Sequence, residues 1–547
     1  MFESLKRAPF NLDDTALAWV RQQYDNMDLQ QRLGQLFNLL VMGESDEQLA
    51  LIRHLQPGGI TRSVGRELQT EINYMQSLLA AFDCPPLVSA DVEGGQMSFA
   101  FGSSMPNQLA LAALNDAEVT ERCASIQARE ARALGINWTF TPVVDLNHSF
   151  RSAIVGTRSY GSDHQVVMQM GRANIRGFQR NGLAATAKHW PGDGYDDRDQ
   201  HLVTSVNPLT VEEWHKQFGV LYRSMIKEGV MSIMSAHIAL PEYMKLYTDD
   251  PEQWWRPASI NRALNQQLLR EELGFNGLIV SDASVMAGLS GWTDRATLIA
   301  ELIENGCDMI LFCREPVEDM AYLLAAVRRG DVSEQRIEEA VLRVLAMKAA
   351  LGLHRTPPKT DIAVFAQQTD MSKVFARCPT LVKDRTDFLP ISAERHPRVL
   401  VFSPGIQHVM QEQPLPLQLP DLLREEGFEV TLFTPEMDVQ TRDYDWVLYL
   451  LAEESSLLRS HIYIDWFRLH GGFMPAMTRY WVDIPTVMVS FGHPYYLYDA
   501  PRVPTYINAY CATAEMQASV LSGLLGRESF NRSNPVDPFC GSEQGRY

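Results

Sequence analysis

A loop rich in aspartate and histidine is the segment of this sequence best suited to chemistry. It reads KHWPGDGYDDRDQHLVTSVNPLT over residues 188–210 and follows an apolar stretch that predicts a β-strand. Asp199 and His201 are two residues apart, so in an extended loop their side chains project to the same side. A carboxylate beside an imidazole favours the protonated ring and fixes its tautomer. The pair predicts a general acid/base, although an arbitrary Asp-x-His pair more often has no function.

Asp282 is the second candidate for a reacting group. It ends the apolar stretch GLIVSDA (277–283), which predicts a strand, and a run of small residues follows it. A carboxylate that is fixed at a strand end, partly desolvated and ionised, suits attack at the anomeric carbon of a sugar. We therefore predict that Asp282 is a nucleophile.

Polar residues also end several other predicted strands, namely Asp91, Asp145, Lys188, His189 and His237. In a barrel of parallel strands the carboxyl ends of the strands carry the active site. A single carboxylate after a strand is about as often the cap of the next helix. Several such residues together favour a site over a set of caps.

The sequence shows no pattern for a metal or a cofactor, and we expect neither. The histidines of the 188–210 loop lack the helical spacing of a zinc-binding HExxH, and the ligand spacing of a calcium loop is absent. The cysteines are scattered, odd in number and without CxxC spacing, which argues against disulfides. They are Cys84, Cys123, Cys307, Cys313, Cys378, Cys511 and Cys540.

Short apolar stretches alternate with amphipathic ones over roughly residues 14–355 and predict strands alternating with helices. The predicted strands are 58–63, 85–91, 140–146, 184–190, 230–237, 277–283 and 307–313; helices are predicted at 116–134, 260–275 and 332–353. This alternation and its length favour a TIM-type (β/α)8 barrel over residues 1–355. A doubly wound sheet is the alternative that periodicity leaves open.

A second, smaller α/β unit is predicted after the barrel. The segment HRTPPKTD (354–361) stops the last helix, and we assign residues 356–392 to a linker. Further strands are predicted at 397–404, 428–435, 445–452, 484–491 and 503–510. We therefore expect an α/β sandwich over residues 393–547, with an irregular tail after Gly526.

The charge composition limits the kinds of partner that the protein is expected to bind. Lys and Arg number 48 against 67 Asp and Glu, giving a formal net charge of −19. Such a surface repels phosphate backbones and anionic lipids, so we expect neither nucleic acid nor membranes as partners. No stretch has the pattern of a signal peptide or a membrane span, and we expect a cytoplasmic protein. A homodimer is one candidate for the oligomeric state, which the sequence leaves open.

Six ordered segments of the first domain resemble glycoside hydrolase family 3, in its two-domain β-N-acetylglucosaminidase branch. They are MDLQQRLGQLF (27–37), SADVEGGQ (89–96), VGTRSYGSD (155–163), AATAKHWPGDG (184–194), SAHIALP (235–241) and REELGFNGLIVSD (270–282). The lysine–histidine–aromatic–Pro–Gly motif is highly specific to the family. The second domain resembles the family's α/β sandwich, most clearly in VMVSFGHPYYL (487–497).

The resemblance implies a role for each matching residue. Asp282 is implied as the nucleophile of a retaining glycosidase, and His201, polarised by Asp199, as its acid/base. The residues implied to bind the sugar are Asp91, Arg158, Lys188, His189 and His237. The implied substrate is a small carbohydrate that ends in β-linked N-acetylglucosamine. Family β-glucosidases instead take a glutamate from the following domain as the acid.

The sequence departs from the family pattern at four positions near the sugar site. Gln96 and Phe99 stand where arginines commonly follow Glu-Gly-Gly, Asp193 replaces a histidine, and Ala283 replaces a second aspartate. None of these positions is the predicted nucleophile or part of the Asp199–His201 pair. They remove positive charge near the sugar, which makes recognition of an acetamido or acidic ligand an open question.

Three alternatives stay open. The first is a phosphorylase on the same scaffold, because a histidine acid/base repels incoming phosphate less than a carboxylate does. The second is a β-glucosidase, which would leave the Asp199–His201 pair unexplained. The third is a catalytically silent sugar-binding protein, which only the departures favour.

Overall fold

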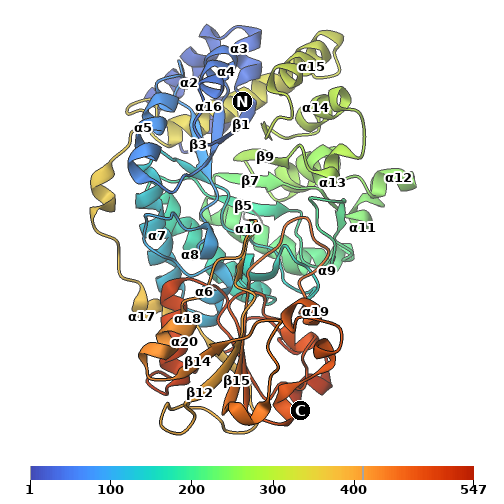
Figure 1. Cartoon of the computed structure of the whole chain (residues 1–547). Coiled ribbons are helices and arrows are strands. Elements are labelled where there is room, and N and C mark those ends of the chain that lie inside the picture. Colours follow the sequence, from blue (N-terminus) through green and yellow to red (C-terminus); the bar gives the residue numbers. More distant parts are fainter. Residues whose placement is uncertain (1, 409–411) are drawn as a thin grey trace.

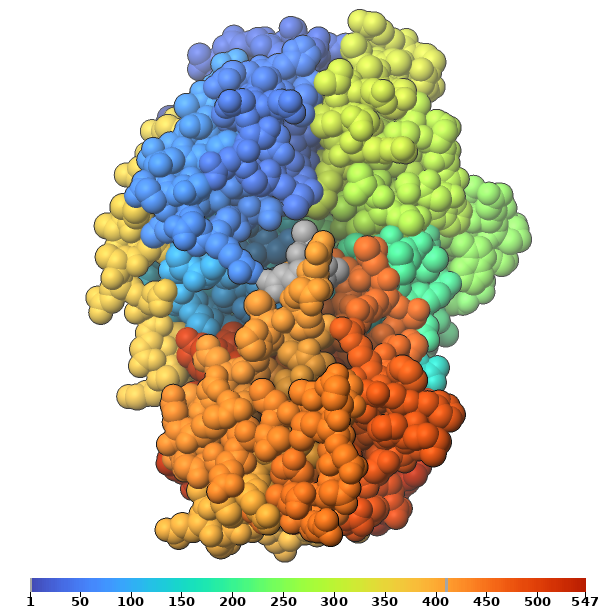
Figure 2. Space-filling view, in the orientation of Figure 1, coloured from blue at the N-terminus to red at the C-terminus, as the bar shows by residue number. Residues whose placement is uncertain are grey.

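A computed structural model describes residues 2–408 and 412–547, which form two parts joined over a broad contact. Figure 1 shows the barrel, blue to green, above a second α/β domain, orange to red. Figure 2 shows the surfaces of the two parts meeting along a seam on the visible face. No helix in the described part of the chain is long and apolar enough to cross a membrane.

The first part is a barrel of eight parallel strands in the order β4-β3-β2-β1-β10-β9-β7-β5. Two parallel bridges, Trp138 to Ala184 and Val143 to Lys188, join the β4 side to the β5 side and close the ring. The strands are β1 (Phe37–Met42), β2 (Gly59–Ser63), β3 (Leu87–Ala90), β4 (Trp138–Thr139), β5 (Thr186–Trp190), β7 (Ser232–Ser235), β9 (Leu278–Ala283) and β10 (Met309–Leu311). The predicted TIM-type barrel is confirmed, and the doubly wound alternative is excluded.

The strand prediction differs from the structure in two places. The predicted strand 140–146 is irregular, and β4 lies just before it as a pair of residues. It is linked to β5 by the bridge between Val143 and Lys188 and by neighbouring backbone hydrogen bonds. β1 was not predicted, because its apolar run follows directly on the short helix α3 (Leu29–Gly34) and shows no strand alternation of its own.

Helices surround the barrel, as the amphipathic stretches predict. They include α7 (Ala117–Ala133), α8 (His164–Gln179), the π-helix η5 (Ala263–Glu272), α14 (Arg295–Glu304), α15 (Pro316–Arg329) and α16 (Glu334–Ala350). Asp116 caps α7 by accepting from the amide of Val119, and Ser333 caps α16 by accepting from the amide of Arg336. Such caps satisfy amides that the first turn leaves without partners.

The second part is built on a mixed sheet in the order β11-β17-β16-β15-β12-β14, with β13 beside β15. Its strands are β11 (Thr380–Asp384), β12 (Arg398–Phe402), β13 (Ile406–Gln407), β14 (Glu429–Leu432), β15 (Trp446–Glu453), β16 (Thr486–Ser490) and β17 (Thr505–Asn508). Helices α18 (Leu419–Glu425) and α20 (Ala514–Leu524) lie beside it (Figure 1). The five strands predicted after residue 393 are all present.

The segment assigned to a linker contains part of the second sheet. β11 lies within 356–392 and pairs antiparallel with β17. Its first residues follow α17 (Ser372–Phe375), and the chain from α16 to α17 runs down the side of the barrel (Figure 1). The linker prediction failed here because β11 is a partly exposed edge strand without a long apolar run.

The carboxyl-end loops of the barrel contact the second domain directly. The Asn107 amide donates to the Glu454 carboxylate at 2.9 Å and to the Tyr510 carbonyl at 2.8 Å. The irregular tail also reaches the barrel, where the Ser162 amide donates to the Pro535 carbonyl at 3.1 Å. The barrel end that carries the polar strand ends is therefore partly covered by the second domain.

Candidate active site

Four charged side chains meet at the ends of β3 and β5. Lys188 Nζ lies 2.9 Å from Asp91 Oδ1 and 2.8 Å from Glu93 Oε1. Arg158 binds both oxygens of Glu93, each at 2.9 Å. The side chains of Lys188 and Glu93 are only 4% and 3% exposed, whereas that of Asp91 is 43% exposed. Asp91 is therefore the member of this cluster that a ligand reaches first.

The charges of this cluster hold one another in the ionised state. Burial alone would raise the pKa of Glu93, but the neighbouring Arg158 and Lys188 outweigh it and keep that pKa far below its usual range. Burial likewise opposes the charged form of Lys188, while Asp91 and Glu93 raise its pKa overall. A sugar hydroxyl entering here meets a fixed cation and a fixed anion, which suits hydrogen bonding in both directions.

His189 is held by Asp145, which lies in the irregular stretch that follows β4. Its Nδ1 lies 2.6 Å from Asp145 Oδ2, and its backbone amide donates to Asp145 Oδ1 at 3.0 Å. The amide of Asp193 donates to the same Oδ1 at 2.9 Å. Asp145 therefore fixes the ring of His189 and the start of the following loop together.

Asp193, which departs from the family pattern, is buried close to Asp145. Burial and the nearby charge of Asp145 raise the pKa of Asp193 well above its usual value. Two carboxylates this close cannot both ionise easily, and Asp145 keeps its charge because His189 lowers its pKa against the effect of burial. Burial and the charge of Asp145 therefore both favour the neutral form of Asp193.

Asp199 and His201 form the contact that their spacing predicts. Asp199 Oδ1 lies 2.6 Å from His201 Nδ1 and accepts the His201 backbone amide at 2.8 Å. Burial opposes ionisation of Asp199, but His201 and the backbone donors lower its pKa overall. The His201 side chain is 25% exposed, and Nε2 has no partner among the described residues. That nitrogen is free to exchange a proton with a ligand.

The loop with His201 packs against the chain that follows Asp282. The Ala287 amide donates to the His201 carbonyl at 2.9 Å. A Cβ on Gly288 would lie 2.2 Å from the Gln200 carbonyl oxygen, so only glycine permits this approach. These contacts bring the predicted acid/base and the predicted nucleophile to one end of the barrel.

Asp282 is the second-last residue of β9 and is almost fully buried. Its Oδ1 accepts the Ala283 amide at 2.7 Å. Burial works against its charge, but His189, His237 and His201 together lower its pKa below the usual value. Asp282 is therefore an ionised, desolvated carboxylate surrounded by histidines, which are the properties of an oxygen nucleophile.

His237 lies under the site rather than on its surface. It is fully buried; its Nδ1 lies 2.9 Å from Ser259 Oγ, and its Nε2 lies 3.0 Å from the Ala283 carbonyl. Both ring nitrogens thus contact protein atoms, and burial lowers the pKa of the ring. His237 is therefore not placed to make the sugar contact that the resemblance implies. It supports the end of β9 instead.

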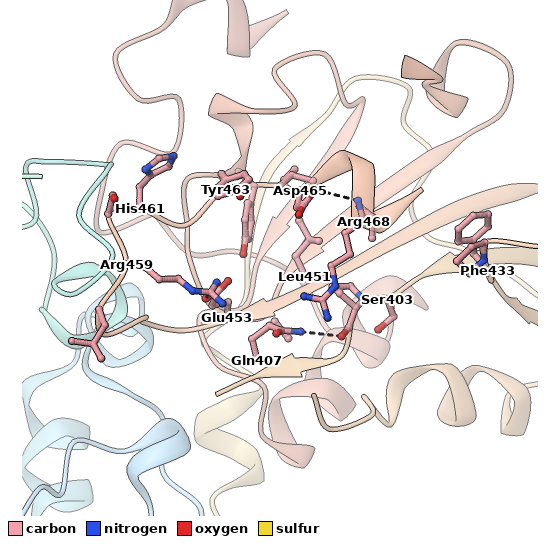
Figure 3. A pocket seen from close by; sticks show the side chains of 18 of the residues that line it. Ser403, Gln407, Phe433, Leu451, Glu453, Arg459, His461, Tyr463, Asp465 and Arg468 are labelled. Carbon is pink, nitrogen blue, oxygen red and sulfur yellow. Dashed lines mark hydrogen bonds and ion pairs between the residues drawn. The ribbon is translucent and has the colours of Figure 1, made fainter. Parts of the chain in front are cut away.

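The second domain contacts the Asp199–His201 pair and lines clefts beside it. The amide of Leu458, in the loop after β15, donates to Asp199 Oδ2 at 2.9 Å. A cleft of about 620 Å³ begins at Leu202, beside His201, and extends over the second domain, where Arg459, Arg468 and Glu453 line it (Figure 3). A second cleft of about 650 Å³ shares Leu202 with it. Space for a ligand therefore adjoins the Asp199–His201 pair.

The structure brings together seven of the eight residues expected from the sequence, and sets His237 beneath them. Sequence reasoning missed the roles of Glu93, Asp145 and Leu458 as their partners. Asp145 was predicted to lie at a strand end, but its contact with His189 was not predicted. No cluster of three or more His, Cys, Asp or Glu that suits a metal ion occurs in the ranges that the structure describes.

A family model described as the glycosyl hydrolase family 3 N terminal domain matches residues 28–347. The chain belongs to glycoside hydrolase family 3. It is 39% identical to a "Beta-N-acetylglucosaminidase/beta-glucosidase" of Cellulomonas fimi, over 98% of each chain. A "Beta-hexosaminidase" of Methylobacillus flagellatus is 29% identical over 54% of this chain and 83% of its own length.

Solved structures of the family agree with the two-domain fold. A "Beta-glucoside phosphorylase BglX bound to 2FGlc" superposes with a TM-score of 0.93 at 30% identity, covering 99% of this chain and all of its own. A family 3 β-N-acetylglucosaminidase from Paenibacillus sp. str. FPU-7 gives a TM-score of 0.80 at 26% identity, covering 94% of this chain and all of its own. The resemblance that the sequence motifs carry is thus confirmed at the level of family and fold.

Proposed function

We propose that this chain is a retaining β-glycosidase that releases terminal β-linked N-acetylglucosamine from small carbohydrates. The observation that carries the proposal is the Asp199–His201 pair, joined at 2.6 Å, beside the ionised carboxylate of Asp282. The names of the Cellulomonas and Methylobacillus relatives and of the Paenibacillus structure support this choice of sugar.

In the proposed first step, the Asp282 carboxylate attacks the anomeric carbon and the bond to the leaving group breaks. The leaving oxygen takes the proton from Nε2 of His201, while Asp199 holds the other ring nitrogen. A covalent glycosyl ester forms on Asp282. The transition state carries positive charge at the sugar ring, which the buried carboxylate stabilises.

In the proposed second step, His201 takes a proton from water, and the water oxygen attacks the same carbon. The ester bond to Asp282 breaks and the sugar leaves with its original β-configuration. Asp91, Lys188, Arg158 and His189 bind the sugar hydroxyls in this proposal; of these, Asp91 offers the most exposed oxygen. His237 acts by supporting the strand that carries Asp282.

The test is the initial rate on two chromogenic β-substrates, the N-acetylglucosaminide and the glucoside, for the wild type, Asp282→Ala and His201→Ala. We expect preference for the N-acetyl sugar and a loss of more than about a thousandfold in Asp282→Ala. Asp197→Ala removes an exposed carboxylate of the same loop and is the matched control. A wild type that turns over neither sugar would overturn the proposal.

Phosphorolysis is a second candidate, favoured by the similarity to the BglX phosphorylase over the whole chain. A histidine acid/base also tolerates an incoming phosphate better than a carboxylate does. Repeating the assay with inorganic phosphate distinguishes the two reactions. Stimulated turnover that yields a sugar 1-phosphate would assign the phosphorylase activity, and phosphate-independent release of free sugar would assign hydrolysis.

A further inference from the structure

The carboxylate of Asp199 is shared between the two domains. Its Oδ1 serves the barrel, through the ring and the backbone amide of His201. Its Oδ2 accepts from the backbone amide of Leu458, which lies in the second domain. The Asp199 side chain is 2% exposed, so water cannot easily replace that donor. A buried carboxylate oxygen that is left without a donor is unfavourable, because the group has lost its water as well.

The loop that supplies the amide is held at both sides of Leu458. The Ser456 amide donates to the Ala153 carbonyl of the barrel at 2.9 Å. Arg459 returns to Glu453, at the end of β15, with a contact of 3.1 Å. The strand end and the barrel therefore fix the position of residue 458 from opposite directions.

Leu458 has the left-handed backbone angle φ +64°. A non-glycine residue rarely adopts this conformation, because its Cβ then lies too close to the following carbonyl oxygen. Burial of the side chain does not compensate for this conformation, because the side chain is 61% exposed. The gain that this conformation brings is the direction of the N–H, which points at Asp199.

We propose that the backbone amide of Leu458 is a positioning group for the general acid/base, so that the second domain completes the catalytic pair of the barrel. The proposal rests on the proposed function of Asp199 and His201. The amide keeps Asp199 ionised and fixes its plane, and Asp199 in turn fixes the tautomer and direction of the His201 ring. Leu458 itself touches neither substrate nor reacting atoms in this role.

The side chain of the same residue faces the cleft of about 620 Å³. The side chains of Leu458 and Arg459 line that cleft together with Gln407, Glu453 and Arg468 (Figure 3). The guanidinium of Arg468 points into this space. This cleft therefore adjoins the loop whose backbone amide holds Asp199.

The proposal predicts a dependence on the leaving group that a general loss of structure would not give. A 2,4-dinitrophenolate leaves without a proton, whereas a 4-methoxyphenolate needs one from His201. Loss of the amide should therefore lower kcat/KM for the 4-methoxyphenyl glycoside and spare the dinitrophenyl glycoside. General acid catalysis contributes about 10²–10⁴-fold, and we expect a loss of at least about tenfold from its misalignment.

The experiment replaces the amide in the full-length protein. Incorporation of the α-hydroxy analogue of leucine at position 458 exchanges the N–H for an ester oxygen, and Leu458→Pro removes the N–H by ordinary mutagenesis. Leu458→Gly keeps the N–H and adopts a positive φ readily, so it is the matched control. We expect the selective loss in the ester and proline forms and rates close to wild type in Leu458→Gly.

Two outcomes would overturn the inference. One is an ester form with unchanged rates on both glycosides; the other is an equal fall on both, which would mean a structural role. If the proline form fails to fold, the ester form and Leu458→Gly still decide the question. A wild type inactive on both glycosides would contradict the proposed function instead, so the two failures are distinguishable.

Discussion

Arg158 and Glu93 form a buried two-point ion pair, with both N–O contacts at 2.9 Å. The side chains are 11% and 3% exposed, and the second cation on Glu93 is Lys188. A pair desolvated to this degree is costly to break, because the remaining charge stays buried. The cluster of Asp91, Glu93, Arg158 and Lys188 is therefore a structural part of the barrel end.

Arg158→Ala should lower the free energy of unfolding by about 3 kcal/mol, the lower end for a broken buried pair, because Lys188 still contacts Glu93. Denaturant unfolding measures this change. Arg172→Ala breaks an ion pair with Glu228 in which the arginine is 45% exposed, and it should cost no more than about 1 kcal/mol. Equal losses in the two variants would contradict the role given to burial.

Asp199→Asn should leave the fold intact and lower kcat/KM for substrates with poor leaving groups by about 10²–10³-fold. The amide cannot stabilise the protonated ring of His201 and offers it a donor as well as an acceptor. The measurement is kcat/KM against pH with the 4-methoxyphenyl glycoside. Asp197→Asn, at an exposed position two residues away, serves as the control. Retention of full activity in Asp199→Asn would remove Asp199 from the mechanism.

Gly288→Ala should displace the loop that carries His201. The new Cβ would lie 2.2 Å from the Gln200 carbonyl oxygen and 2.8 Å from that of Val203, and backbone atoms cannot give way cheaply. We expect a loss of about ten- to a hundredfold with poor leaving groups, while a 2-fluoro glycoside still labels Asp282. In Gly291→Ala, the nearest atom would be 3.2 Å away. Similar kinetics for the two variants would show that the close approach at Gly288 is unimportant.

Glu454 should make the stability of the chain depend on pH. It is buried between the domains, its Oε1 has no hydrogen-bond partner in the described structure, and burial raises its pKa from 4.5 to about 7. The folded state thus binds its proton more tightly than the unfolded state. Its contribution is fully present below about pH 4.5 and is lost as the pH rises through about 7.

Glu454→Gln mimics the protonated acid and removes this dependence. Between pH 5 and 8 the wild type should lose up to about 3 kcal/mol of unfolding free energy relative to Glu454→Gln. Denaturant unfolding of both proteins at the two pH values gives the comparison. The exposed Glu425→Gln, also in the second domain, provides a matched control. Parallel pH profiles for the wild type and Glu454→Gln would argue against a raised pKa.

The sequence was sufficient to predict the parts of the site that are local. Asp199 and His201 are neighbours in one loop, so their contact follows from a spacing of two residues. Asp282, Lys188 and His189 end apolar strands, and parallel strands bring their ends together. The barrel itself follows from the alternation of predicted strands and helices, and these residues lie at the ends of those strands.

The remaining features depend on contacts between distant segments. Leu458 meets Asp199 across 259 residues and uses a backbone amide, which every residue but proline carries. The residue type at position 458 therefore gives no indication of such a contact. β11 was missed for a related reason, since it is recognisable as a strand only through its pairing with β17. His237 follows a strand as predicted, but its ring is held by Ser259 of the short 3-10 helix η4 (Ala258–Ile260), a contact that the sequence does not indicate.

The dependence of Asp199 on Leu458 has a consequence for synthesis of the protein. A ribosome makes His201 and Asp282 long before it reaches residue 458, and the strand β15 that carries the loop needs β16, which is made later still. At about 5–20 residues per second, the 259 residues that separate the two partners take between about 10 and 50 s. If Leu458 has the role proposed above, the newly made barrel lacks the amide that positions its acid/base until the end of that interval, and full activity on substrates with poor leaving groups arrives only when the last third of the chain has folded.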